Sequence, residues 1–186
     1  MNRFDPGGDD SYFVARRLDS FVGRFGYGHS YVVSNATRVG DPNATIHSFG
    51  KLSNGNMGSV NDPNRAADVS KTTFQSDSNN WRSLAPDATK DVVKLNAPDK
   101  TVDAVAGAVK ENTPYALNPS SSSATPDTNS NSAAFAVGDK AQQLSTGKSD
   151  SVVNEKTIDL TLPGASAAGK VAFQCTTAMH SIGGCK

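Results

Sequence analysis

The stretch from residue 27 to 60 constrains the fold most, because short β-rich runs alternate there with dense turn signals. Residues 30–34 are rich in aromatic and β-branched side chains, and residues 44–49 alternate between two faces. A Gly-Asp-Pro-Asn turn at residues 40–43 separates these runs, and an Asn-Gly pair then precedes a short run at residues 57–60. This pattern predicts an antiparallel β-meander of three strands.

Two histidines fall on neighbouring strands of this predicted meander. His29 opens the first strand, and His47 lies inside the second. We therefore expect them on adjacent antiparallel strands, where both imidazoles can share one face. A lone histidine on a strand is usually structural, so it is their pairing that makes them candidate functional residues.

Three further segments carry helical periodicity. Residues 98–111 begin with Pro and Asp and then repeat apolar residues at helical spacing; those residues are Val102, Val105, Ala106 and Val109. A second helix is predicted from a cap at Asn131 or Ser132 through residue 144, with an apolar stripe at Ala134, Val137, Ala141 and Leu144. Residues 13–22 fit a short amphipathic helix.

The remaining segments are polar. In residues 61–96, Trp81 and Leu84 are the expected anchors to the core. Residues 1–10 are expected to be flexible, and the Ser- and Pro-rich residues 118–128 are expected to form a loop. Short strands are predicted over residues 157–162 and 171–173. Together, residues 1–186 read as one α+β domain in which a small antiparallel sheet packs against two or three helices.

Charge and hydropathy exclude several functional classes. The 186 residues include 18 basic and 18 acidic side chains, so no long-range attraction to nucleic acid is expected. No apolar run approaches the length of a membrane span, and the first 25 residues lack the apolar core of a Sec signal peptide. If the protein is secreted, we expect another device, such as fusion to a larger secreted polypeptide. Phosphate-binding, G-x-S-x-G and H-E-x-x-H motifs are absent, and no cofactor is expected.

Two cysteines lie near the end of the chain. Cys175 and Cys185 are close enough in sequence to close a small loop, and free thiols are the alternative. His180 lies between them. Three such ligands on a Gly-containing segment are weak evidence for a metal, so no metal site is predicted.

The start of the predicted second helix is the strongest candidate for a nucleophile. Residues 129–132 read Asn-Ser-Asn-Ser, and a hydroxyl at a helix N-terminus has unpaired backbone N–H groups beside it. Ser130 is the candidate nucleophile, Ser132 is an alternative, and His29 is the candidate base with His47 orienting it. Because Ser and Asn are also the preferred helix caps, a plain cap is the competing interpretation.

These residues resemble the circularly permuted papain-like group, which includes lecithin retinol acyltransferase-like and NlpC-type enzymes. The resemblance rests on residues 28–33, on Thr45-Ile46-His47 and on residues 129–132 before a helix. It implies a permuted papain-like fold, with His29 as the base, His47 as its orienting partner and the nucleophile at position 130. This chain has Ser where that group has Cys.

A second resemblance concerns the N-terminal segment. Asn-Arg-Phe-Asp-Pro-Gly at residues 2–7 resembles the close of an RHS-repeat core, which precedes a variable toxin domain in bacterial polymorphic toxins. It implies a secreted effector delivered by a larger RHS-type carrier polypeptide and a cognate immunity protein as a partner.

Three hypotheses about function follow from the sequence, of which the third is a plain structural piece of a larger surface protein. The first is a toxin or effector domain that acts as a hydrolase or acyl transferase on an amide or ester bond, through Ser130 or Ser132 and His29. The second is a non-catalytic binding or surface module of the same fold, in which Ser130 only caps a helix.

Overall fold

A computed structural model of the chain describes residues 10–17, 28–88, 91–116 and 129–147. The strands are β1 (Asp10–Arg17), β2 (Gly28–Ala36), β3 (Thr45–His47), β4 (Phe49–Lys51), β5 (Met57–Ser59) and β6 (Val92–Lys94). The helices are α1 (Asp68–Ser83), α2 (Asp99–Gly107) and α3 (Ser130–Thr146).

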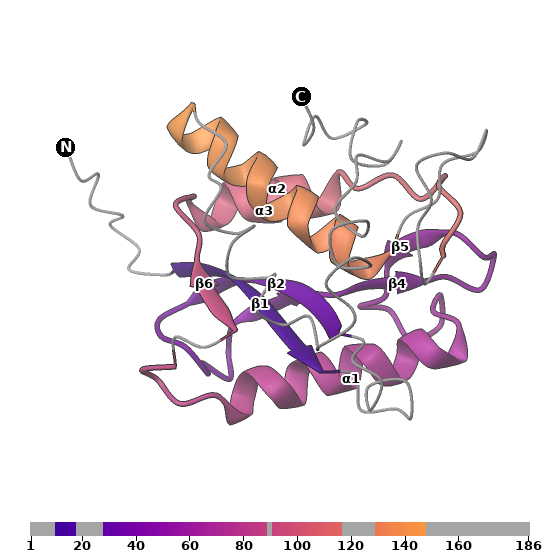
Figure 1. Cartoon of the computed structure of the whole chain (residues 1–186), viewed down its shortest axis with the longest axis horizontal. Helices are drawn as coiled ribbons and strands as arrows, with labels where there is room; N and C mark the ends of the chain where they lie inside the picture. Colours follow the sequence, from indigo (N-terminus) through magenta and orange to yellow (C-terminus); the bar gives the residue numbers. More distant parts are fainter. Residues whose placement is uncertain (1–9, 18–27, 89–90, 117–128, 148–186) are drawn as a thin grey trace, which may run out of the picture.

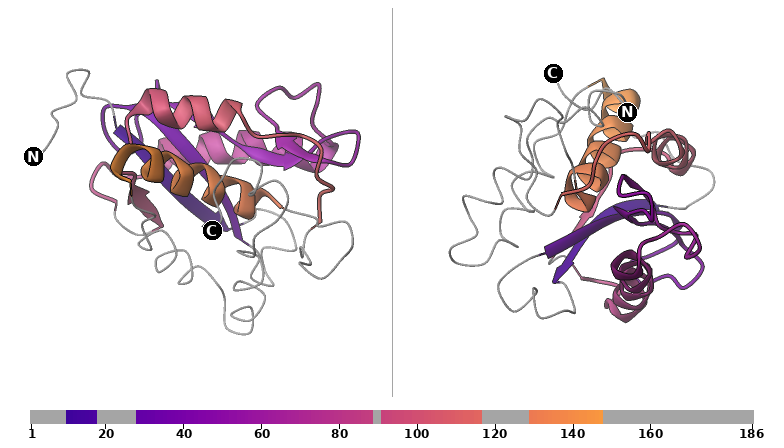
Figure 2. Two further views of the ribbon diagram at one scale, coloured as in Figure 1. Left: turned by 90° about the horizontal axis from the view of Figure 1, so that it is seen from above. Right: turned by 90° about the vertical axis from the view of Figure 1, so that its right-hand side faces the viewer.

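The larger sheet has four antiparallel strands in the order β3-β2-β1-β6, and β4 pairs with β5 in a separate two-stranded sheet. Figures 1 and 2 show α1 on one face of the larger sheet and both α2 and α3 on the other. The predicted α+β class is therefore confirmed.

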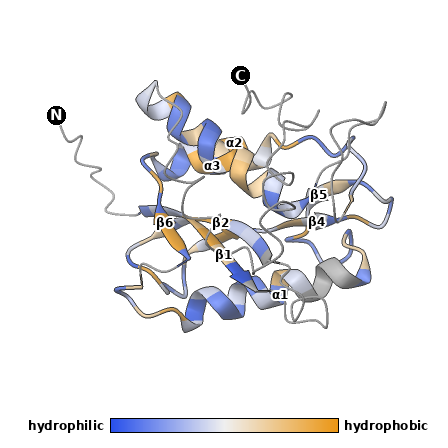
Figure 3. Cartoon of the chain, viewed as in Figure 1, coloured by the Kyte–Doolittle hydropathy of each residue, from blue (hydrophilic) through white to orange (hydrophobic). Residues whose placement is uncertain are grey.

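The two central strands carry apolar side chains on both faces. On β1, Tyr12 and Val14 belong to the core cluster that contains Trp81 of α1, whereas Phe13 and Ala15 belong to the cluster formed with α2 and α3. This alternation follows from the two-residue period of a strand. Figure 3 shows how hydropathy is distributed over the elements: apolar positions concentrate on β6 and the middle of α3, while α1 is largely hydrophilic.

Polar side chains fasten the start of α2 to the sheet. Asp99, in the first turn of α2, is buried and accepts a hydrogen bond of 2.6 Å from the Ser11 hydroxyl. The same carboxylate oxygen accepts the backbone N–H of Asn35, which has a φ of 57° in the left-handed region, one residue before the end of β2. A carboxylate in the first turn of a helix is also favoured by the helix dipole.

The predicted helix over residues 13–22 is wrong where the structure describes it, because residues 10–17 form β1. Over so short a run, the apolar residues fit both the 3.6-residue period of a helix and the two-residue period of a strand. Two-sided burial decides between them: Tyr12, Phe13, Val14 and Ala15 are all buried, and a strand between two helical layers can bury every one of these side chains.

The predicted meander is partly correct. The first two strands pair as expected, and Val32 on β2 lies opposite His47 on β3. The chain then leaves this sheet at Ser48, so residues 49–51 pair with residues 57–59 instead. Gly55, with a φ of 89°, lies in the connection between β4 and β5, as the Asn-Gly signal predicted.

The helix predictions at residues 98–111 and 131–144 are confirmed in position, with differences at the ends. Val102, Val105 and Ala106 are buried on α2. The N-cap of α3 is Asn129, two residues before the predicted cap, and Leu144 is 60% exposed, so it lies outside the buried stripe. Residues 61–96 contain α1, which was not predicted.

Trp81 is 1% exposed and Leu84 packs against the same cluster, so both expected anchors are confirmed. The predicted flexible segment at residues 1–10 is wrong at its last residue, because Asp10 begins β1, and residues 1–9 lie outside the described residues. The other predictions also lie outside the described residues: these are residues 118–128, the strands at residues 157–162 and 171–173, Cys175, His180 and Cys185. Among the described residues, no helix is long and apolar enough to cross a membrane.

The facing of α2 gives a test of the fold. Val102 is fully buried in the cluster beneath α2 and α3, whereas Ala104 on the same helix is exposed. Val102→Asp buries a carboxylate without a partner and is expected to lower the free energy of unfolding by about 3 kcal/mol or more. Ala104→Asp introduces the same charge on the exposed side and should cost less than about 1 kcal/mol. Urea denaturation measures both; a loss for Ala104→Asp that equals or exceeds the loss for Val102→Asp would contradict this facing of α2.

Candidate active site

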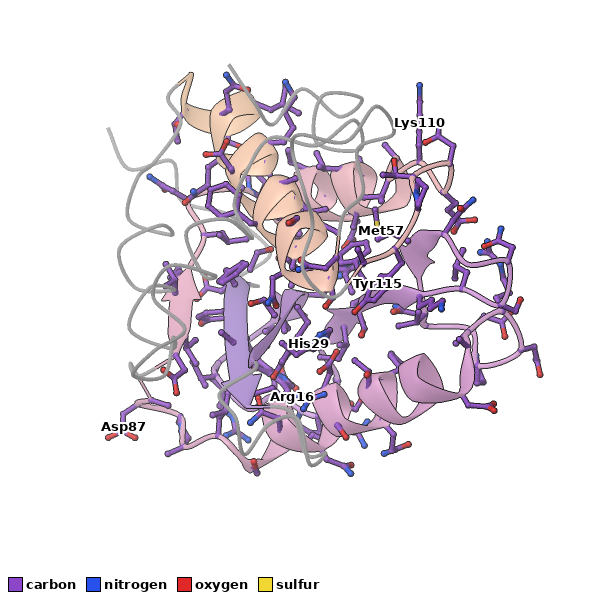
Figure 4. All side chains as sticks on the ribbon, turned by 45° about the vertical axis from the view of Figure 1, so that its right-hand side comes forward. Arg16, His29, Met57, Asp87, Lys110 and Tyr115 are labelled. Atoms are coloured by element: carbon purple, nitrogen blue, oxygen red, sulfur yellow. The ribbon has the colours of Figure 1, made fainter. Side chains whose placement is uncertain are left out.

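His29 lies near the start of β2 and faces α1. It sits directly opposite Arg16 of β1, and the two side chains share the face that carries Tyr31 and Val33. Figure 4 shows Arg16 and His29 between the strands and α1. His29 is 2% exposed and Arg16 is 6% exposed, so both polar side chains need partners inside the protein.

Asp77 of α1 supplies the shared partner and is fully buried. Its Oδ1 accepts a 2.6 Å hydrogen bond from Arg16 Nε, and its Oδ2 lies 2.9 Å from His29 Nε2. Ser48, in the chain between β3 and β4, also donates its hydroxyl to Oδ2 at 2.5 Å. Asp77 thus joins α1, both central strands and the connection to the second sheet.

Ser130 meets the other side of the same imidazole. Its Oγ lies 2.9 Å from His29 Nδ1, and it occupies the first position of α3. Asn129 holds that helix start, because its side chain accepts the backbone N–H of Ser132 at 3.0 Å. The local sequence therefore builds a capped helix whose first residue points its hydroxyl at His29.

These contacts form one continuous series from Asp77 through His29 to Ser130. The neutral imidazole with its proton on Nε2 fits both ends, since Nε2–H donates to the Asp77 carboxylate while Nδ1 accepts the Ser130 hydroxyl. This is the order nucleophile, base and orienting carboxylate that activates a serine in hydrolases. Relative to the chymotrypsin-type arrangement, the two ring nitrogens exchange roles.

The surroundings keep Asp77 ionised. Burial alone raises the pKa of its carboxyl group, but His29, the Arg16 guanidinium and the Ser48 hydroxyl together outweigh that effect and hold the pKa below its ordinary value. An ionised Asp77 can stabilise a positive charge that forms on His29.

Tyr115 is a second contact of the candidate nucleophile. Figure 4 shows it near the first turn of α3. Burial raises the pKa of the Tyr115 phenol, and a hydrogen bond with the Ser130 side chain partly offsets that rise. The phenol therefore remains a neutral hydroxyl beside Ser130.

The first turn of α3 also places the positive end of a helix dipole beside Ser130. Its cap hydrogen bond runs from Ala133 N–H to Asn129 O. The helix dipole favours a developing negative charge next to the Ser130 hydroxyl.

The expected role of His47 is wrong. Adjacent antiparallel strands do carry His29 and His47, as predicted, but His47 shares a face with its partner Val32, which is the face that α2 and α3 cover. His47 Nε2 lies 2.9 Å from both Asp103 of α2 and the Ser34 hydroxyl. Alternation along β2 places His29 on the opposite face, where Asp77 occupies the position that the sequence assigned to His47.

The His47 cluster is a structural contact between α2 and the sheet. The Ser34 hydroxyl donates to Asp103 at 2.5 Å, so its proton points to the carboxylate and not to the imidazole. Burial lowers the pKa of His47, and Asp103 only partly opposes this effect. His47 is therefore favoured as a neutral donor that fastens α2.

Of the two predicted serines, Ser130 is the one in hydrogen-bond contact with His29. Ser132 is fully buried two residues further along the same helix turn, with its N–H bound by the Asn129 side chain. Among the described residues, no group of three or more His, Cys, Asp or Glu side chains is placed to hold a metal ion.

Sequence reasoning missed Asp77, Arg16 and Ser48. A signal for Asp77 was present: Phe74, Asp77 and Trp81 follow helical spacing, so the carboxylate falls on the side marked by two aromatic residues. A signal for Arg16 was its spacing: it follows Tyr12 and Val14 at two-residue intervals, so in a strand all three side chains lie on one face.

No protein family model, no curated protein and no solved structure matches this chain. Function is therefore inferred from the geometry of the site.

Removing the Asp77 charge tests the electrostatics of the site. Asp77→Asn leaves the buried Arg16 guanidinium without its carboxylate, and we expect it to lower the free energy of unfolding by about 3–5 kcal/mol at pH 7. The lowered pKa of Asp77 means that its contribution is present above about pH 3.9 and is lost as pH falls below that value. Denaturant unfolding should therefore show the difference from the unmodified protein shrinking between pH 4 and pH 2.

Asp87→Asn is the matched control, because Asp87 is exposed. Its effect should stay below about 0.5 kcal/mol across the same pH range. A difference for Asp77→Asn that stays constant down to pH 2 would contradict the lowered pKa.

Proposed function

We propose that this chain is a serine-dependent hydrolase or acyl transferase that acts on an amide or ester bond. The observation that supports it is the buried hydrogen-bonded series of Asp77, His29 and Ser130, with both ring nitrogens of one histidine about equally close to a hydroxyl and a carboxylate. A serine needs such a base to become a competent nucleophile.

The proposed reaction begins with attack of Ser130 Oγ on the carbonyl carbon. The hydroxyl proton moves to His29 Nδ1, and the Asp77 carboxylate stabilises the resulting imidazolium through Nε2–H. The tetrahedral intermediate then collapses, the carbon–leaving group bond breaks, and the leaving group takes the proton from Nδ1. Water, or another nucleophile in a transferase, attacks the acyl-Ser130 ester by the same steps and restores the free hydroxyl.

Negative charge on the tetrahedral intermediate is placed beside the start of α3. The positive end of the α3 helix dipole is proposed to stabilise that charge.

A non-catalytic binding module is the second candidate. The observation in its favour is that Ser130 is only 6% exposed, so a substrate must gain access to it. In that case the Ser130, His29 and Asp77 contacts are a satisfied buried polar network that stabilises the junction of α1, β2 and α3.

We also propose that the domain is a secreted bacterial effector or toxin carried by a larger RHS-type polypeptide, with a cognate immunity protein as its partner. This proposal rests on the resemblance at residues 2–7. The permuted papain-like relationship is likewise a proposal, supported by a strand histidine that contacts the first residue of a helix.

Covalent labelling distinguishes the two functions. A fluorophosphonate probe should form an Oγ–phosphorus bond with Ser130, releasing fluoride, because the His29 base activates that hydroxyl. Ser130→Ala should abolish labelling, while Ser132→Ala in the same helix turn should keep it. Mass spectrometry of the labelled peptide identifies the site. Labelling lost only in Ser132→Ala would move the nucleophile, and a folded protein that is never labelled supports the binding module.

The two histidines provide a second test. His29→Ala should slow labelling about 10²- to 10⁴-fold, the usual contribution of a general base. His47→Ala should label at the rate of the unmodified protein once it is shown to be folded, because His47 contacts α2 on the other face of the sheet. Equal loss of rate in both variants would contradict the assignment of His29 as the base.

A further inference from the structure

Arg16 is a buried cation whose position is tied to the candidate base. In the sheet register it lies opposite His29, so both side chains extend from neighbouring strands toward α1. Arg16 is 6% exposed, and its described side-chain bonds run to α1. Burial of the guanidinium costs desolvation energy, which these charge-assisted bonds offset.

The Arg16 guanidinium donates hydrogen bonds to two groups of α1. Nε donates to Asp77 Oδ1 at 2.6 Å, and Nη2 donates to the backbone carbonyl of Thr73, one helical turn earlier, at 3.2 Å. Bonds to the side chain and to the backbone of the same helix restrict both the carboxylate and the helix turn that carries it. Oδ1 is thereby occupied, and Oδ2 is directed at His29 Nε2.

Arg16 also places a positive charge beside the Asp77 carboxylate. Without it, the remaining described donors to the Asp77 carboxylate are His29 and the Ser48 hydroxyl, both uncharged when His29 is neutral. Burial alone favours protonation of this carboxyl group. A protonated Asp77 would no longer balance the imidazolium that forms when Ser130 loses its proton.

We propose that Arg16 is a positioning residue for the serine reaction, and that it acts through Asp77 by holding the carboxylate in place and directed at His29 Nε2. This inference rests on the proposed function. It adds a fourth residue, on a different strand, to the three that carry the chemistry.

The test compares the rate of fluorophosphonate labelling across pH in Arg16→Gln and Arg16→Lys. Arg16→Gln should label about tenfold or more slowly at pH 7, and its rate should reach half of its maximum at a higher pH than that of the unmodified protein. Arg16→Lys retains the charge but not the planar two-point contact, so its rate should lie between the two.

Arg65→Gln is the matched control. Arg65 also pairs with a carboxylate, Glu111, but its side chain is 49% exposed. This variant should label like the unmodified protein. Thermal unfolding shows whether each variant is folded. If Arg16→Gln is not folded, Arg16→Lys provides the test instead. Labelling of Arg16→Lys at the rate of the unmodified protein at every pH would overturn the proposal.

A double variant separates action through Asp77 from a general structural role. In an Asp77→Asn background, Arg16→Gln should reduce the rate little further, because the two residues act as a unit. An additional loss as large as that of Arg16→Gln alone would overturn the proposal, as would an unchanged rate and pH profile in Arg16→Gln.

A measurement that does not depend on labelling or enzymatic activity tests this inference separately from the proposed function. Carbon-13 NMR of the Asp77 carboxyl group should show a higher pKa in Arg16→Gln than in the unmodified protein. If the unmodified protein is never labelled at Ser130, the serine reaction fails while this measurement still reports the Arg16 and Asp77 coupling. If labelling occurs and the pKa of Asp77 is the same in both proteins, the role of Arg16 fails alone.

Discussion

The buried ion pair between Arg16 and Asp77 is the interaction on which the site depends. Two charges away from water are costly, and they are tolerated here because hydrogen bonds satisfy both carboxylate oxygens. The pair joins β1 to α1, and through His29 it also determines how the imidazole of β2 is oriented. The Ser130 hydroxyl at the start of α3 then meets a ring that is already held in place.

A second set of polar contacts works on the opposite face of the sheet. Asp99 and Asp103 of α2 bind hydroxyl, imidazole and backbone groups of the strands, and His47 belongs to this set. The two clusters thus contain similar residue types in different hydrogen-bond arrangements. In the Asp103 cluster the Ser34 proton is directed at a carboxylate, whereas the Ser130 hydroxyl of α3 faces a ring nitrogen of His29 that can accept a proton.

Local patterns predicted the elements whose signals are short-range. The turn at residues 40–43, the pairing of the two histidine strands and the positions of α2 and α3 were all readable from residue spacing. The pattern failed at β1, where apolar residues buried on both faces of a strand resemble a helix, and at α1, whose face toward the sheet includes the charged Asp77. Ser130 and His29 could be selected as candidates because each lies at the start of an element, a helix or a strand, that residue spacing predicts.

Residue spacing alone establishes the α+β class, a histidine on each of two paired strands and a serine at the start of a helix. Which of these groups meet depends on tertiary packing. Alternation along β2 separates His29 and His47 onto opposite faces, and Asp77, 48 residues from His29 in the chain, reaches that histidine only when α1 packs on the sheet. Periodicity specifies the face on which a side chain lies, whereas its partner depends on how whole layers pack, and that information is not local.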